Sequence, residues 1–260
     1  MNTTLFINEI KIKAVPTIML VLFLFLLMSS CSRKFYAPNQ VVVPNLTDQH
    51  DMAISAGLLS GNGINGFGID VGYSPLKNLG IIADYSYFLS SDLDDRSYGH
   101  IWNFGVGTYI PTEKINWEIY AGYGEGFNHQ LLGTGIGEWV DFNMRRFFAQ
   151  ASFTVPTKYF HFFAGLRVAG LDFYDALIIS SEPQANLSDI EFIRLNTPFY
   201  LFEPTWGFRV GTPGLYFTLQ RTSSFSQLNT RNFSSPMSSI GVQVTPELWR
   251  TKNTKQRVQF

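Results

Sequence analysis

Residues 98–110 read YGHIWNFGVGTYI, and the character of the side chains alternates along this stretch. Large apolar side chains recur at every second position, at Trp102, Phe104, Val106 and Ile110. The positions between them are Asn103, Gly105, Gly107 and Tyr109. Strict alternation over about ten residues predicts a β-strand and not a helix.

The same period of two returns in residues 65–74, 159–168 and 204–210. Short turns with proline at 74–78, 111–114, 156–158 and 212–214 alternate with longer polar connections, and proline is tolerated in such turns. This punctuation predicts about ten strands, with eight as the alternative. The expected spans are 50–60, 65–74, 78–90, 98–110, 115–127, 145–155, 159–173, 199–211, 214–225 and 236–245.

The composition narrows the class of protein. The chain of 260 residues is 16% aromatic, with 24 Phe, 12 Tyr and 5 Trp, and only 15% charged, whereas an ordinary soluble domain is about 25% charged. Such a chain is not disordered, and its net charge of −1 shows no basic excess for nucleic acid. One cysteine excludes a disulfide scaffold. A large core or a surface that faces lipid remains.

The two faces of the predicted strands favour the lipid-facing surface. One face is aromatic and aliphatic, and the other is Gly, Ser, Thr, Asn and Gln with isolated charges. An exterior in water would carry many Lys and Glu. We therefore predict an all-β fold, a single antiparallel up-and-down transmembrane barrel with short periplasmic turns and longer extracellular loops.

Aromatic residues fall at two levels of this predicted barrel. Tyr73, Trp117 and Tyr159 lie beside the short turns, and a second set lies toward the long loops: Tyr85, Tyr87, Tyr98, Trp102 and Tyr123. Two such levels are typical of the girdles at the two membrane interfaces. Packing of the aromatic residues in a soluble core is the alternative.

The first thirty residues are predicted to be a signal peptide. Lys11 and Lys13 precede an apolar run at 14–28, and small residues follow. A transmembrane anchor is the alternative, but the run is short for a spanning helix and contains Pro16. Cys31, the only cysteine, comes next in a stretch that resembles the lipobox of bacterial lipoproteins. That resemblance implies a diacylglycerol and acyl chains on Cys31, and we expect no other cofactor.

The remaining boundaries follow from composition. Residues 31–49 contain two prolines and show no periodicity, which predicts a lipidated, extended linker. The barrel is expected over residues 50–246. Residues 247–260 form a polar, basic C-terminal tail.

Several motifs resemble small outer-membrane β-barrel lipoproteins of Bacteroidetes bacteria. They are CSRKFYAP from Cys31, Val43-Pro44, DVGYSPLKNLGI from Asp70, and DYSY from Asp84. The resemblance implies an outer-membrane location, reached by export with lipoprotein processing, and insertion by the outer-membrane assembly machinery. It implies no defined activity. The expected partners are this machinery and outer-membrane lipid, with no nucleic acid, and the chain is expected to be a monomer.

Six charged residues are predicted to point into the lumen, because they share the parity of the small residues. Asp70, Asp84 and Glu118 come from the second, third and fifth strands, and Arg146, Arg167 and Arg209 from the next three. Buried charges need partners or water. We expect a network across the lumen that fills and stiffens a closed barrel. A wet constriction that sorts solutes by charge is the alternative.

Signals for catalysis are weak. Residues 61–66 match G-x-G-x-x-G, but a strand pattern follows where a nucleotide site needs a helix, so we interpret them as a hairpin loop. No His or Cys cluster suggests a metal site. An enzyme would need a catalytic group at the rim, where His129, Glu125 and Glu138 are the candidates. We predict no enzymatic activity.

The longest expected loop, residues 175–198, contains Ser188-Asp189-Ile190-Glu191, a capping-box pattern. A short helix that plugs the mouth and an exposed loop are both consistent with it. The predicted function is a structural or surface-interaction role with a largely closed lumen. A small solute-diffusion pore is the first alternative, and a lipid-modifying enzyme of the outer membrane is the second.

Overall fold

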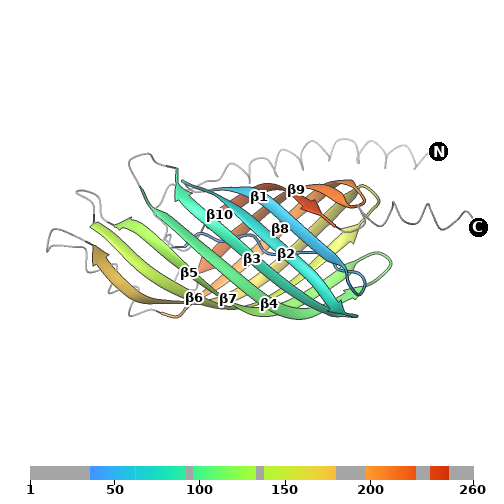
Figure 1. Cartoon of the computed structure of the whole chain (residues 1–260), viewed down its shortest axis with the longest axis horizontal. Helices are drawn as coiled ribbons and strands as arrows, with labels where there is room; N and C mark the ends of the chain where they lie inside the picture. Colours follow the sequence, from blue (N-terminus) through green and yellow to red (C-terminus); the bar gives the residue numbers. More distant parts are fainter. Residues whose placement is uncertain are drawn as a thin grey trace, which may run out of the picture. The chain divides into compact units, whose positions relative to one another are not determined.

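The computed structural model describes residues 36–61, 63–91, 96–132, 138–179, 197–226 and 235–245, without the side chains of 131, 132, 138, 176–179 and 235. Ten strands form one closed antiparallel barrel in which each strand pairs with its neighbours in sequence and β1 pairs with β10 (Figure 1). No helix in these ranges is long and apolar enough to cross a membrane. The strands are β1 (Met52–Gly61), β2 (Ile64–Leu76), β3 (Leu79–Ser90), β4 (Tyr98–Pro111), β5 (Asn116–Leu132), β6 (Glu138–Pro156), β7 (Phe160–Ile179), β8 (Phe199–Thr212), β9 (Leu215–Ser226) and β10 (Ser235–Val244).

The prediction of a barrel with ten strands is confirmed, and the alternative of eight strands is wrong. Connections at 77–78, 112–115, 157–159 and 213–214 lie at one end, which we call the turn end. The facing ends of β1 and β2, β3 and β4, β5 and β6, β7 and β8, and β9 and β10 lie at the other, the loop end. β1 begins and β10 finishes at the turn end, as an even number of strands requires.

The strands β5, β6 and β7 extend further toward the loop end than the alternation predicts. Residues 128–143 were expected to be a loop, but β5 continues to Leu132 and β6 begins at Glu138. The His129 ring stacks on Trp139 of the opposite strand, with ring centroids 4.5 Å apart, and stabilises this hairpin. In the β6–β7 ladder, a register shift between Asp141 and Asn143 adds one residue on β7, near Asp175, and interrupts the alternation of that strand. In β6 the alternation continues, but its inward positions Val140, Phe142 and Met144 are large and apolar instead of small and polar.

The exterior of the barrel is apolar on every strand. Large hydrophobic side chains with exposed fractions of 37–68% occur on all ten, among them Leu58, Phe67, Tyr85, Phe104, Ile119, Phe147, Val168, Phe202, Phe217 and Ile240. Trp117 lies beside a turn, and Trp102 lies opposite Glu125, eight residues further along β5. These eight residues span about 26 Å of strand, or roughly 20 Å along the axis of a strand tilted by about 40°.

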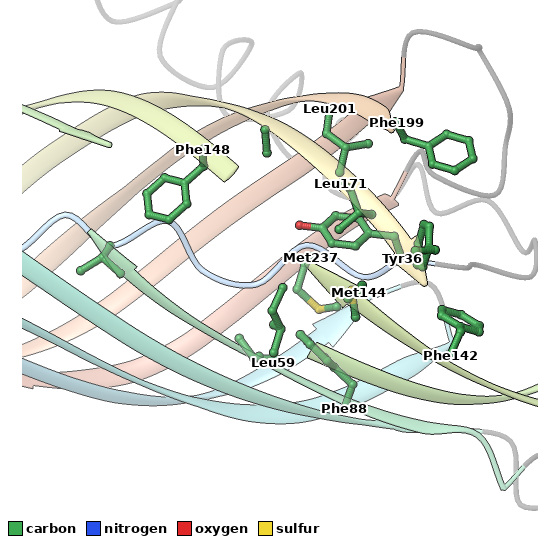
Figure 2. Close-up of a cluster of buried hydrophobic side chains, with 14 of the residues drawn as sticks. Tyr36, Leu59, Phe88, Phe142, Met144, Phe148, Leu171, Phe199, Leu201 and Met237 are labelled. Carbon is green, nitrogen blue, oxygen red and sulfur yellow. The ribbon is translucent and has the colours of Figure 1, made fainter. Parts of the chain in front are cut away.

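The interior is less uniformly small and polar than the sequence suggested. Phe88, Phe142, Met144, Phe148 and other inward-facing side chains form a buried hydrophobic cluster in the half of the lumen nearer the loop end (Figure 2). Large apolar groups are stable inside the barrel because they have apolar surface to pack against. Part of that surface comes from outside the ten strands.

That surface belongs to a segment predicted to be a linker. Residues 36–47 are extended but form no strand, and the side chains of Tyr36, Val41, Val42, Val43 and Leu46 are at most 3% exposed. The segment runs inside the barrel from the hydrophobic cluster toward the turn end, reverses at 48–50 and enters β1 (Figure 1). The interpretation as an external linker is therefore wrong for these residues. The prediction failed because a segment without periodicity can still be buried when neighbouring side chains form hydrogen bonds with its backbone N–H and C=O groups.

Candidate functional site

The lumen contains the candidate functional site, and its central element is residues 36–46, which we call the plug. A buried backbone outside a sheet needs hydrogen-bond partners for its N–H and C=O groups. Pro38 and Pro44 lower the demand because proline has no N–H. The side chains of the barrel wall supply the remaining partners.

Six consecutive carbonyls of the plug accept hydrogen bonds from the wall. Arg167 donates to the carbonyls of Asn39 and Gln40, at 3.3 and 3.4 Å. The next four carbonyls accept from four further strands: Val41 from Gln220 (3.0 Å), Val42 from Gln150 (2.8 Å), Val43 from Arg209, and Pro44 from Gln243 (3.1 Å). Side chains of β6 to β10 thus replace the ladder that a strand would provide.

Next to the turn end, the opposite wall binds the same segment. The carboxylate of Glu118 accepts from the backbone N–H groups of Asn45 and Leu46, at 3.2 and 3.1 Å. Asn116 donates to the carbonyl of Leu46 at 2.7 Å. Hydrogen bonds to a charged acceptor are stronger than neutral ones, so Glu118 fixes the point at which the plug leaves the lumen.

A charge cluster surrounds the other half of the plug. Arg167 Nε lies 2.5 Å from Glu203 Oε2, and Arg146 Nη1 lies 4.0 Å from the same oxygen. Asn103 of β4 links Arg146 to Asp84, because it accepts from Arg146 and donates to Asp84 at 2.7 Å. Two arginines and two carboxylates make this cluster neutral, as buried charges require.

The plug itself connects the two sides of the cluster. The amide of Asn39 accepts from both Arg146 (2.9 Å) and Arg167 (2.8 Å) and donates to Asp84. The hydroxyl of Tyr36 donates to Glu203 at 2.7 Å and accepts from Arg146. The charged walls are therefore joined largely through Asn39 and Tyr36.

All six residues predicted to line the lumen are buried there, with acids on β2, β3 and β5 and arginines on β6, β7 and β8. Glu203 is a fourth buried acid, on the arginine side, that the prediction omitted although it shares the parity of Arg209. Asp70 faces Asp84 across the β2–β3 ladder and hydrogen-bonds Ser55. Tyr36, Asn39 and Asn103 were also missed, and for the first two the sequence contains no strand pattern that would reveal them.

Glu125 and His129, two of the three candidate catalytic residues, are each paired with a different side chain. Glu125 accepts a 2.5 Å hydrogen bond from Tyr123 on the outer face of β5. His129 lies four residues further along that strand, with Nδ1 2.5 Å from Asp141 Oδ1 and its ring stacked between Tyr98 and Trp139. The Glu138 side chain is outside the described residues. Within the described ranges there is no group of three metal-ligating side chains.

Several predictions fall outside the described residues. They concern the signal peptide at 1–30, Cys31, the capping box at Ser188 and the polar tail at 247–260. These stay predictions.

No protein-family model matches the chain, and no curated protein sequence matches it. Similar solved structures are the outer-membrane protease OmpT of Escherichia coli (11% identity, 80% of this chain and 99% of that one, TM-score 0.41) and the translocator domain of autotransporter NalP of Neisseria meningitidis (12%, 75% and 88%, 0.41). A third is the N-terminal barrel domain of OprF of Pseudomonas aeruginosa (9%, 76% and 99%, 0.34). This likeness concerns the barrel fold and assigns no activity to this chain.

Proposed function

We propose that the protein is an integral outer-membrane barrel closed by its own N-terminal segment, with a structural or surface-interaction role. The exterior supports the membrane location. Every strand presents exposed large hydrophobic residues. The Trp117 and Trp102 levels are separated by roughly 20 Å along the axis, which fits within the ~25 Å height of the apolar band of such barrels. In water, a hydrophobic surface that surrounds the whole barrel would promote aggregation.

The plug is the observation that carries the proposed role. Its six consecutive carbonyls, at Asn39 to Pro44, lie inside the barrel and are bonded to side chains of β6 to β10. The hydrophobic cluster around Tyr36 fills the half nearer the loop end. A solute-diffusion pore would require this segment to leave, and Arg146 and Arg167 would then lose their hydrogen bonds to the Asn39 amide, and Arg146 its bond to the Tyr36 hydroxyl.

The plug has a defined direction in the barrel. Tyr36 lies in the half of the lumen nearer the loop end, and Leu46 lies beside the turn end. The loop end faces the exterior of the cell if the turns are periplasmic, so the described part of the plug runs from the exterior half of the lumen toward the periplasm.

Processing and assembly are part of the proposal. Residues 1–30 direct export, Cys31 is lipidated, and the assembly machinery inserts the barrel as a monomer. Metabolic labelling with radioactive palmitate tests the lipid: the wild-type protein is expected to be labelled and Cys31→Ser unlabelled. Equal labelling of both proteins would remove the lipoprotein assignment.

Single-channel recording in planar bilayers tests the closed lumen. The wild-type protein is expected to give no stepwise current, and a variant that lacks residues 36–46 is expected to conduct. Heat-modifiable electrophoretic migration shows that the deletion variant is folded. Stepwise currents from the wild type would refute the closed lumen, and a folded but silent deletion variant would show that the plug is not what closes it.

A further inference from the structure

The turn end of the lumen contains a cavity of about 290 Å³ beside the last residues of the plug. Its walls include Leu46 of the plug, Arg209 of β8 and Gln243 of β10, and exposed Thr157 and Lys158 lie at its rim. The volume admits several waters or a small anion. The cavity is separate from the neutral charge cluster around Asn39.

Arg209 is the residue that gives this cavity its chemistry. It is 4% exposed, and its guanidinium lies over the Phe163 ring, 4.4 Å from the centroid. Nη2 donates to the Val43 carbonyl, while Nε and Nη1 have no hydrogen-bond partner among the described residues. A buried guanidinium with unpaired N–H groups is costly unless something in the cavity accepts them.

No carboxylate of the described chain fills that need. Glu118 and Asp70 are close enough to act on Arg209 electrostatically, but neither makes an ion pair with it among the described residues. Both oxygens of Glu118 accept from plug N–H groups. Asp51, the acid that lines the cavity, accepts from Thr47 and Asp48.

The other polar groups of the lining fit a ligand that both accepts and donates. Lys158 adds a second cation at the rim, and His161 lies on the same wall. Gln243 Oε1 and Thr245 Oγ1 are buried without a partner in the described structure. A carboxylate has no proton to give Gln243, whereas a singly protonated phosphate accepts from Arg209 and Lys158 and keeps a hydroxyl to donate.

We propose that this cavity is a binding site for a phosphate group, with Arg209 as its principal ligand and Lys158 as the entry residue. Arginine suits this task because its planar, permanently charged donors match phosphate oxygens. The phosphate reaches the site from the turn end, either as the free ion or as part of a lipid headgroup.

The ³¹P NMR line width of inorganic phosphate, titrated with the full mature protein in a neutral detergent, tests the site. The wild type is expected to bind saturably with one phosphate per barrel. Arg209→Gln is expected to weaken binding at least tenfold, and Arg209→Lys to bind with intermediate affinity. Lys114→Gln removes an exposed charge at the same end that does not line the cavity, and it is expected to bind as the wild type does.

Lys158→Gln, which changes an exposed side chain, is expected to weaken phosphate binding about threefold. This variant still tests the site if Arg209→Gln does not fold. Acetate is expected to compete poorly. Dihexanoyl phosphatidate, added below its micelle-forming concentration, separates the two sources of the phosphate group. If phosphatidate binds more tightly than inorganic phosphate and displaces it at a lower concentration, the ligand is a lipid headgroup. If phosphatidate binds more weakly, the ligand is the free ion. Absence of saturable binding to the wild type, or equal binding by a folded Arg209→Gln variant, would overturn the proposal.

Discussion

The neutral charge cluster makes a quantitative prediction for Glu203→Gln. The new amide has nearly the same shape and still accepts from Tyr36, but it removes the negative charge that lies 2.5 Å from Arg167 Nε and 4.0 Å from Arg146 Nη1. Two buried arginines are then opposed by Asp84 alone. Breaking a buried ion pair in this way costs about 3–5 kcal/mol of unfolding free energy.

Urea unfolding of the protein in lipid vesicles, followed by tryptophan fluorescence, measures that loss. With a slope of about 3 kcal/mol per molar urea, the midpoint is expected to fall by about 1–1.7 M. Glu113→Gln makes the same chemical change in an exposed turn, and its effect is expected to stay within about 0.5 kcal/mol.

Arg167→Gln combined with Glu203→Gln separates charge balance from packing. The double variant leaves Arg146 opposite Asp84, so the cluster is neutral again. Its loss of stability is expected to be at least about 2 kcal/mol smaller than the sum of the two single losses, because residues in one network are not additive. Two results would refute the view that charge balance stabilises the plugged lumen. One is a loss of unfolding free energy below about 1 kcal/mol for Glu203→Gln, and the other is a loss in the double variant equal to the sum of the two single losses.

Three further predictions concern the plug and the exterior. A Cβ at Gly72 would overlap Pro44 of the plug, so Gly72→Leu is expected to displace the plug and give channel currents. A folded variant without channel currents would contradict the close approach of Gly72 to Pro44. A peptide tag inserted at Gly63, in the β1–β2 connection at the loop end, is expected to be labelled by an impermeant reagent on intact cells, whereas the same tag at Lys77 is not. The reverse pattern would invert the proposed orientation of the barrel. Phe104→Arg on the outer face is expected to cost about 2–4 kcal/mol of stability in lipid, measured by the same urea assay, and no loss would argue against lipid at that position.

Local alternation was enough to predict the architecture. Stretches such as 98–110 place one set of side chains outward and the other inward with a period of two, which is a property of the strand itself. Prolines in the short turns then divide the chain into ten strands. The same parity placed Asp70, Asp84, Glu118, Arg146, Arg167 and Arg209 inside, and it would have placed Glu203 there as well.

The closure of the lumen was decided only by the tertiary structure. Residues 36–46 have no period, because they pair with no single neighbouring strand. The carbonyls of Asn39 to Pro44 are bonded to side chains of five different strands, more than a hundred residues away in the sequence. The same holds for Asn39, whose amide is unremarkable in the sequence and connects Asp84 with two arginines in the fold. The sequence by itself determined that this chain forms a barrel suited to lipid, since alternation is local. What fills that barrel depended on contacts that exist only after the barrel has closed.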